Sequence, residues 1–205
     1  MIKRVIFDID YTLLKPNYDE EHTFFSKINM NDYFLNHIGE VLDYYEKTHI
    51  HYEVNDFLKY LSHYSKTSLD EEFLKCWFQF NTELKEQDVS EAVEILEYLR
   101  QQKVEIVALS NLFTTAQRKK LEKVGLIQYF DEVYGGDIYL KPYIESYLTA
   151  IGYCAPNECL MIGDNLQVDV IAPSNLGIHG IHYTQSESNH EYPKIKKLTE
   201  IKKYF

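Results

Sequence analysis

The sequence contains few cysteines and no long apolar run. Its three cysteines include no CxxC pair and leave one over, which argues against a disulfide framework and favours buried thiols in a reducing compartment. No apolar stretch reaches the about 20 residues that a membrane-spanning helix needs. The apolar run before Asp8 has only three residues, too few for the core of a signal peptide. We therefore expect a cytoplasmic protein that does not bind membranes.

Positive charge is also scarce. Arginine occurs only three times, and the net charge is −11. Binding to nucleic acid or to an anionic membrane depends on basic patches, so this charge argues against both as partners. The 205 residues, 45% of them hydrophobic, suffice for one soluble globular core with an inserted subdomain. The expected partner is a small molecule, and we expect a monomer or a homodimer.

The sequence does contain a short apolar segment that ends in two aspartates. Val5, Ile6 and Phe7 are typical of a strand buried on both faces of a parallel sheet. Asp8 and Asp10 follow, and side chains two apart on a strand point to the same side. Like charges so close together raise each other's pKa unless a cation lies between them. Because hard oxygen ligands of this kind suit Mg²⁺, the segment predicts a magnesium site.

The rest of the chain divides into a helical part and an alternating part. Residues 15–87 are rich in aromatic residues and nearly free of glycine, and their apolar residues recur at helical spacing. From residue 88 helices and strands alternate, which predicts a parallel sheet covered on both faces. Because the first strand belongs to that sheet, the helical part is an insertion. We expect a Rossmann-like α/β core formed by residues 1–14 and 88–205, with residues 15–87 as an inserted all-helical cap.

Local signals give approximate limits for several elements. Residues 68–71 have the pattern of a capping box, which predicts a helix start, and Ser90 predicts another. Apolar residues at helical spacing in 195–201 predict a helix at the end of the chain. Strands are expected at residues 104–109, 132–134, 159–163 and 178–183.

Polar residues follow the expected strands at the edge where ligands bind in open α/β folds. After the first strand these residues are Asp8, Asp10 and Thr12. The others are Ser110 and Asn111 after the second strand, Lys141 in a loop before a helix, and Asp164, Asn165 and Asp169 after the fourth strand. Because the carboxyl ends of parallel strands meet at one edge, we expect a single site there.

These residue types suit transfer of a phosphoryl group to a carboxylate. Asp8 would attack phosphorus and become an aspartyl phosphate. Asp10 would protonate the leaving oxygen and then take a proton from the water that hydrolyses the intermediate. A Mg²⁺ ion held by Asp8, Asp164 and the backbone carbonyl of Asp10 would offset the repulsion between nucleophile and phosphate.

The remaining polar residues have supporting roles in this scheme. The set expected to bind the phosphate comprises Ser110, Asn111, Lys141 and Thr12. Capping of the next helix is an equally good interpretation of Asn111. Asp169 would orient Lys141 or support the metal from behind, and Asn165 is expected to contribute to the same support.

In these residues the chain resembles the haloacid dehalogenase superfamily of phosphohydrolases, in the branch whose helical, C1-type cap follows the first motif. The DxDxT motif of that family is matched at residues 8–12, its Ser/Thr motif by Ser110, its lysine by Lys141 and its GDxxxxD motif at residues 163–169. The resemblance covers the whole core and implies Mg²⁺-dependent hydrolysis of a phosphomonoester, with the residue roles given above. One departure lies at residues 87–90, where many relatives have a Pro-Gly turn.

Three other functions remain open from the sequence. A hexose-phosphate mutase would need cations in the cap for a second phosphate, and lysines such as Lys27, Lys47 and Lys59 would have to serve. A 2-haloacid dehalogenase would lack the second aspartate and hold a carboxylate with arginine, whereas Asp10 is present and residues 15–87 contain no arginine. A non-catalytic binding protein would be expected to have lost part of the motif set. A phosphatase acting on a small phosphorylated metabolite is therefore the leading hypothesis.

Overall fold

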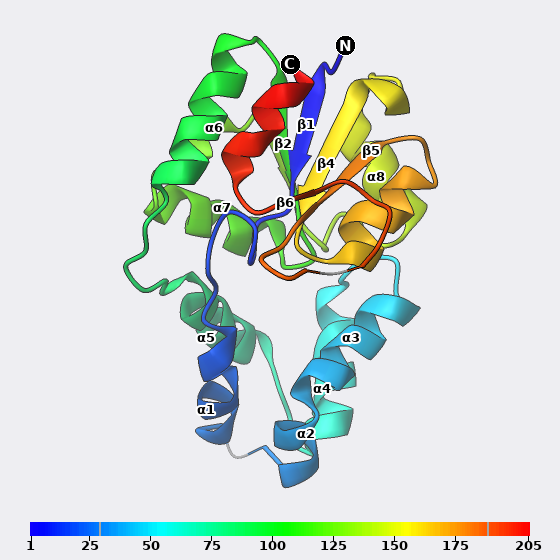
Figure 1. Cartoon of the computed structure of the whole chain (residues 1–205). Coiled ribbons are helices and arrows are strands. Elements are labelled where there is room, and N and C mark those ends of the chain that lie inside the picture. The colour runs from blue at the N-terminus through cyan, green and yellow to red at the C-terminus, as the bar shows by residue number, and fades with distance from the viewer. Residues whose placement is uncertain (29, 188) are drawn as a thin grey trace.

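The computed structural model describes residues 1–28, 30–187 and 189–205. In these residues the core is a six-stranded parallel sheet with the strand order β3-β2-β1-β4-β5-β6 (Figure 1). The strands are β1 (Arg4–Phe7), β2 (Glu105–Leu109), β3 (Glu132–Tyr134), β4 (Cys159–Gly163), β5 (His179–Tyr183) and β6 (Lys194–Ile195). The predicted α/β fold class is confirmed.

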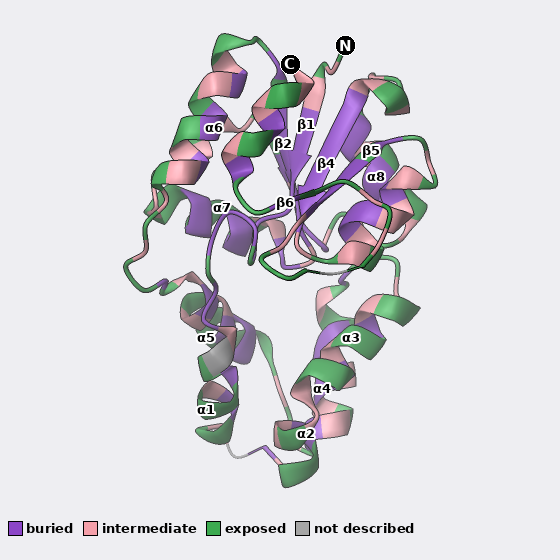
Figure 2. Ribbon diagram, viewed as in Figure 1, coloured by how far each residue is buried: buried purple, intermediate pink, exposed green. Residues whose placement is uncertain are grey.

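Helices cover both faces of the sheet. The helices of the core are α6 (Ser90–Gln101), α7 (Thr114–Lys123), η2 (Ile127–Tyr129), α8 (Ile144–Ile151), η3 (Pro156–Glu158), η4 (Leu166–Ile171), α9 (Ala172–Ser174) and η5 (Leu198–Tyr204). On β1, Val5 and Phe7 share an apolar cluster with α6 and η5, whereas Ile6 packs with α8 on the opposite face. All three side chains are fully buried, which is the two-residue period of a strand covered on both sides. Figure 2 shows the central strands β1 and β4 buried over most of their length, whereas the helices carry exposed residues on their outer sides.

The segment between β1 and α6 is helical and lies at the carboxyl edge of the sheet (Figure 1). This helical segment, residues 18–82, contains η1 (Tyr18–Glu20), α1 (Glu21–Ser26), α2 (Asp32–Asn36), α3 (Ile38–Thr48), α4 (Val54–Ser65) and α5 (Glu71–Thr82). Its interior is aromatic, with Phe25, Tyr45, Phe57 and Trp77 buried in one cluster. Within the described residues, no helix of the chain has the length and apolarity to cross a membrane.

The helical segment packs directly against the core. Its apolar cluster takes in Phe113 and Leu140 of the core, and the ring of Tyr52 stacks on Phe113 with 4.8 Å between ring centres. Two backbone hydrogen bonds of 2.8 Å join the same regions, from Tyr52 N to Gly136 O and from Leu140 N to Ile50 O. The helical segment is therefore held against the core by both apolar and polar contacts.

The two connections between core and helical segment are tied to each other. The side-chain amide of Gln87 accepts a hydrogen bond from Lys15 N at 2.7 Å and donates one to Lys15 O at 3.3 Å. This pairing lies where the sequence departs from the Pro-Gly pattern of its relatives. The limits of the cap at residues 15 and 87 stay a prediction, because the apolar cluster of the helical segment continues into the core.

Two helix starts differ from the sequence prediction. The cap of α5 is Asp70 rather than Ser68, and its Oδ1 accepts hydrogen bonds from Glu72 N and Phe73 N at 3.1 and 3.2 Å. At α6 the N-cap position is occupied by Val89, which makes no side-chain cap, and the side chain of Asp88 just before it accepts from the N–H of Ser90 at 2.9 Å. Serine and aspartate are both good caps, so a sequence that offers two of them near a helix start does not decide between them.

The end of the chain forms the predicted helix only in its last part. Lys194 and Ile195 pair with β5 as strand β6, and residues 198–204 form the 3₁₀ helix η5. Ile195, Leu198 and Ile201 are buried as expected. Apolar residues three apart suit a 3₁₀ helix as well as an α-helix, so the spacing identified the buried residues without deciding the backbone conformation.

Candidate active site

Asp8 lies at the point where the strand order of the sheet reverses. β1 has β2 on one side and β4 on the other, which forms the crevice where open α/β sheets bind ligands. Asp8 directly follows β1, and its N–H donates to Ile162 O in β4 at 2.9 Å. Tyr11 then adopts a left-handed conformation with φ 62°, and Leu13 N donates to Ile9 O at 2.8 Å. This strained turn carries the chain from the sheet to the helical segment.

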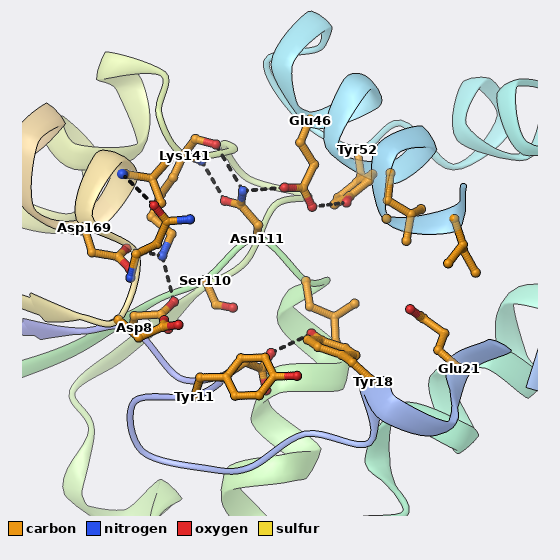
Figure 3. Close-up of a pocket in the computed structure, with 18 of the residues that line it drawn as sticks. Asp8, Tyr11, Tyr18, Glu21, Glu46, Tyr52, Ser110, Asn111, Lys141 and Asp169 are labelled. Atoms are coloured by element: carbon orange, nitrogen blue, oxygen red, sulfur yellow. Dashed lines mark hydrogen bonds and ion pairs between the residues drawn. The ribbon is translucent and has the colours of Figure 1, made fainter. Parts of the chain in front are cut away.

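A pocket of about 590 Å³ opens between the sheet edge and the helical segment (Figure 3). All of the predicted site residues except Thr12 line it: Asp8, Asp10, Ser110, Asn111, Lys141, Asp164, Asn165 and Asp169. The opposite wall belongs to the helical segment and includes Trp77 together with four residues that the sequence did not single out: Tyr18, Glu21, Glu46 and Tyr52. The tertiary structure thus assembles one cavity from strand ends and the helical segment.

Lys141 connects two of the aspartates. Its Nζ lies 2.7 Å from Asp8 Oδ1 and 2.7 Å from Asp169 Oδ1, and all three side chains are buried. Burial would lower the pKa of Lys141, but the carboxylates of Asp169 and Asp8 raise it above its ordinary value, so the lysine stays protonated. Burial together with the charges of Asp169 and Asp164 raises the pKa of Asp8 to about 8, against the effect of Lys141. This site is short of positive charge.

A divalent cation fits this deficit. Carboxylate oxygens of Asp8, Asp164 and Asp169 lie within 4.8 Å of one another. Burial and the charge of Asp169 raise the pKa of Asp164 to about 6, which is the expected consequence of uncompensated carboxylates. Three hard oxygen donors around one point suit Mg²⁺. The side chain of Asp10 is not in this cluster, and the predicted role of its backbone carbonyl stays a prediction.

Asp169 is held beneath the end of β4 by two contacts. Its Oδ1 accepts from Lys141, and its Oδ2 accepts from Asn165 N at 3.0 Å. Gly163 makes room for it, because a Cβ there would lie 2.3 Å from the carboxylate of Asp169. The side chain of Asn165 accepts from the N–H groups of Gln167 and Val168 and so caps η4. Asp169 is therefore in contact with Lys141, and its predicted role of orienting that lysine or supporting the metal stays a prediction.

The residues predicted to bind the phosphate differ in how far their polar groups are already engaged in hydrogen bonds within the protein. Ser110 accepts a hydrogen bond from Gln117, which leaves its own hydroxyl proton for a ligand. Asn111 donates to Glu46 and to Lys141 O, and accepts from Lys141 N at 2.7 Å, so its amide is already engaged. Thr12 donates to Asp8 Oδ2 at 3.3 Å and lies behind the pocket wall. Direct phosphate contacts of Asn111 and Thr12 stay predictions.

Asp10 is held by three residues that sequence reasoning missed. Lys120 Nζ lies 2.8 and 3.0 Å from its two oxygens, and Gln117 and the hydroxyl of Tyr18 each donate to Oδ2 at 2.8 Å. Lys120 is completely buried. Gln117 and Lys120 lie three apart on one face of α7, which is the only sequence signal they carry. That spacing is equally typical of a solvated helix face, so it did not reveal the contact.

The fold and this site together define an α/β enzyme with a carboxylate, a lysine and a serine gathered at the carboxyl edge of its sheet. The chain belongs to the haloacid dehalogenase-like hydrolase family, since the model of that family matches residues 2–177. The predicted family and the predicted hydrolase class are confirmed.

Individual relatives are distant. The chain is 30% identical to the ribulose-1,5-bisphosphate 5-phosphatase of Halopiger xanaduensis over 105 residues, which are 49% of this chain and 44% of that protein. It is 27% identical to the pyrimidine 5′-nucleotidase PynA of Streptococcus pneumoniae over 157 residues, 70% of this chain and 66% of that protein. The alignments thus span less than two thirds of both relatives. A HAD phosphatase from Thermococcus onnurineus shares the fold, with a TM-score of 0.65 and 22% identity over 99% of this chain and 97% of that chain.

Proposed function

We propose that the protein is a Mg²⁺-dependent phosphatase that hydrolyses a small phosphomonoester through an aspartyl phosphate. The observation that carries the proposal is the buried contact of 2.7 Å between Lys141 Nζ and Asp8 Oδ1 at the end of an open pocket. A carboxylate beside a fixed ammonium group is suited to receive a phosphoryl group whose charge that ammonium offsets. The names of both curated relatives, a phosphatase and a nucleotidase, support the same reaction class.

In the first step Asp8 attacks phosphorus. A bond forms between a carboxylate oxygen and phosphorus, and the bond from phosphorus to the alcohol oxygen breaks. Lys141 and the hydroxyl of Ser110 are placed to offset charge on the phosphoryl oxygens. The product of this step is an aspartyl phosphate and a leaving alcohol that needs a proton.

Asp10 is proposed to move that proton. Its carboxyl group gives a proton to the leaving oxygen, and then takes one from the water that attacks the aspartyl phosphate. Hydrolysis returns Asp8 as a free carboxylate and releases inorganic phosphate, so protons balance over the cycle. The bonds from Tyr18, Gln117 and Lys120 set the direction in which the Asp10 carboxyl points.

The carboxylates of Asp8 and Asp164, with the backbone carbonyl of Asp10, would hold the Mg²⁺ ion. When bound, the ion supplies positive charge that reduces repulsion between the attacking carboxylate and the phosphate. The contact with Asp169 holds the ammonium group of Lys141 beside Asp8. We also propose that residues 15–87 act as a cap that excludes water from the reaction.

The mutase and dehalogenase alternatives gain no support from the pocket. Lys27, Lys47 and Lys59 are exposed, and none of them lines the described pocket. Lys47 pairs with Asp43 on the outside of α3. No arginine lines this pocket in the described part of the chain, so a carboxylate clamp of the dehalogenase kind is missing there.

Release of inorganic phosphate tests the proposed function. We expect the purified protein to hydrolyse p-nitrophenyl phosphate and small phosphomonoesters in Mg²⁺, to lose the activity in excess EDTA, and to regain it when Mg²⁺ is added back. Thermal melts of the same samples should show a higher Tm with Mg²⁺, because the ion offsets the charges of Asp8 and Asp164. Full turnover in thoroughly chelated buffer would refute the metal role, and no turnover of any ester by folded protein would refute the phosphatase.

Lys120→Met tests the positioning of Asp10. Methionine has a similar length and lacks the charge, so the Asp10 carboxylate loses its only cationic partner among the described residues. We expect kcat to fall about 10- to 100-fold with a smaller change in KM, and stability to fall by about 3 kcal/mol. Lys119→Met is the matched control, because Lys119 is exposed on the same helix. Equal effects of the two variants on kcat would contradict the role of Lys120.

A further inference from the structure

The wall that the helical segment contributes to the pocket is acidic and aromatic. It carries the carboxylates of Glu21 and Glu46 and the rings of Tyr18, Tyr52 and Trp77. Among the described residues, no lysine or arginine of the helical segment lines the pocket. This wall faces Asp8 across the cavity, so it contacts the part of the substrate that leaves with the alcohol oxygen (Figure 3).

Glu21 is a buried carboxylate with one oxygen left for a ligand. Only 8% of the residue is exposed, and its Oε1 accepts from Trp77 Nε1 at 3.0 Å. In the described residues its Oε2 has no hydrogen-bond partner and no ion pair. Burial raises the pKa of Glu21 to about 7, against the bond from Trp77 and the charge of Lys120, an ammonium group that is already paired with Asp10. A carboxylate buried beside a cavity without a cationic partner is costly unless a ligand supplies that partner.

Glu46 is held at the pocket by neutral donors alone. Its Oε1 accepts from the hydroxyl of Tyr52 at 2.7 Å, and its Oε2 accepts from Asn111 at 2.8 Å. Burial raises the pKa of Glu46 despite both hydrogen bonds. Since Asn111 also binds the backbone of Lys141, this contact fixes the position of the Glu46 carboxylate relative to the reacting end of the pocket.

The charges of the whole cavity set a limit on the substrate. In the described residues six carboxylates and one ammonium group line it, and that ammonium, on Lys141, is already shared by Asp8 and Asp169. In the proposed reaction a Mg²⁺ ion and the substrate phosphate would both lie at the Asp8 end, where their charges would offset each other. A second anionic group on the substrate would lie against Glu21 and Glu46 with no cation to receive it. The repulsion would lower the affinity for such a substrate several-fold or more.

Building on the proposed phosphatase activity, we propose that the Glu21–Glu46 wall selects phosphomonoesters whose alcohol part carries a positively charged nitrogen and no second anionic group. Phosphorylated amino alcohols and amine-bearing phosphorylated sugars have this chemistry. A buried ammonium group between two carboxylates forms charge-assisted hydrogen bonds, about twice as strong as neutral ones. The relative named as a ribulose-1,5-bisphosphate phosphatase acts, by its name, on a substrate with a second phosphate. Among the described residues, this pocket has no lysine or arginine besides Lys141 to bind a second phosphate.

Three esters of similar size isolate the charge of the alcohol part. At pH 7, 2-aminoethyl phosphate carries an ammonium group at its far end, n-propyl phosphate carries no charge there, and phosphoglycolate carries a carboxylate. We expect kcat/KM to be about 10-fold or more higher for the amine than for the propyl ester, and lower again for phosphoglycolate. The difference should lie mainly in KM, because the ammonium contact is made equally in the ground state and the transition state.

Glu21→Gln, Glu46→Gln and the double variant identify the residues responsible. At position 21 the glutamine oxygen still accepts from Trp77. At position 46 the glutamine oxygen can accept from Asn111 while its amide donates to the hydroxyl oxygen of Tyr52, so a purely structural role is largely preserved. We expect the ratio of kcat/KM between the amine and the propyl ester to fall at least tenfold in the double variant. Glu40→Gln is the control, because Glu40 is an exposed acid on α3 outside the pocket lining. In this variant the ratio of kcat/KM between the amine and the propyl ester should match that of the wild type.

The outcomes separate this inference from the proposed function. Wild-type turnover of the propyl ester at a rate equal to or above that of the amine would overturn the charge selection and leave the phosphatase intact. Loss of turnover for all three esters in parallel in the double variant would also overturn it, since that pattern indicates a structural role. Failure of the wild type on every ester, including p-nitrophenyl phosphate, would instead overturn the phosphatase on which the inference rests.

Discussion

Replacing Asp8 with asparagine is expected to lower phosphate release by at least about 10⁴-fold, the scale observed when an enzyme loses its nucleophile. Asparagine has nearly the same shape, but its amide does not form a stable ester with phosphorus. The measurement is steady-state phosphate release in Mg²⁺, with a mass spectrum of quenched wild-type enzyme to detect phosphate on Asp8. Turnover at the wild-type level in this variant would contradict the assignment of Asp8.

The fold should survive this substitution. Asparagine replaces the buried carboxyl group of Asp8, whose pKa is raised to about 8, with a neutral amide. Lys141 keeps its contact of 2.7 Å with Asp169. We therefore expect Tm to stay within a few degrees of the wild type. Asp8→Ala guards against activity regained by deamidation of the asparagine. Asp43→Asn serves as the matched control, because Asp43 forms an exposed ion pair with Lys47 and contributes at most about 0.5 kcal/mol.

Lys141→Met is expected to damage both activity and stability. The phosphoryl oxygens lose a fixed cation, which should lower kcat about 10²- to 10³-fold. Asp8 and Asp169 lose their shared partner, and removing one member of a buried ion pair destabilises a protein by about 3–5 kcal/mol. Chemical denaturation in EDTA and in Mg²⁺ measures the loss of stability. Part of the lost stability should return with Mg²⁺, because the ion then becomes the cation for Asp8.

Lys119→Met is the control for Lys141→Met as well. It removes an exposed lysine, so we expect little change in kcat or in the free energy of unfolding. If Lys141→Met were as stable as the wild type in EDTA, the buried lysine would not be compensating the carboxylates. If Mg²⁺ raised the stability of Lys119→Met but not that of Lys141→Met, Lys141 itself would be needed to shape the metal site.

The central part of the site could be read from the sequence because parallel strands bring distant residues to one edge. Asp8 follows β1, Ser110 follows β2 and Asp164 follows β4, and strands joined by helical crossovers place these carboxyl ends together. The same alternation of helices and strands predicted the fold class. Only the polarity and length of each segment are needed for this inference, and both are local properties of the sequence.

Local backbone details were predicted less well. Asp70 rather than Ser68 caps α5, and the terminal helix begins only at Leu198, after Lys194 and Ile195 have paired with β5. The competing conformations at these places differ by about 1 kcal/mol or less, since serine and aspartate are similar caps. Packing against the rest of the chain is large enough to decide between them, and packing is not visible in a short window of sequence.

What the sequence alone determined is the set of polar groups, from Asp8 and Asp10 to Lys141 and Asp169, that the fold gathers at one edge of the sheet. Only the tertiary structure decided which groups surround them. Lys120 has the same appearance in the sequence as the exposed Lys119, yet it is fully buried against Asp10. Glu21 and Glu46 resemble ordinary charged positions on helices until the helical segment folds over the sheet edge. Their roles depend on contacts between residues far apart in the chain, and such contacts follow from packing rather than from local pattern.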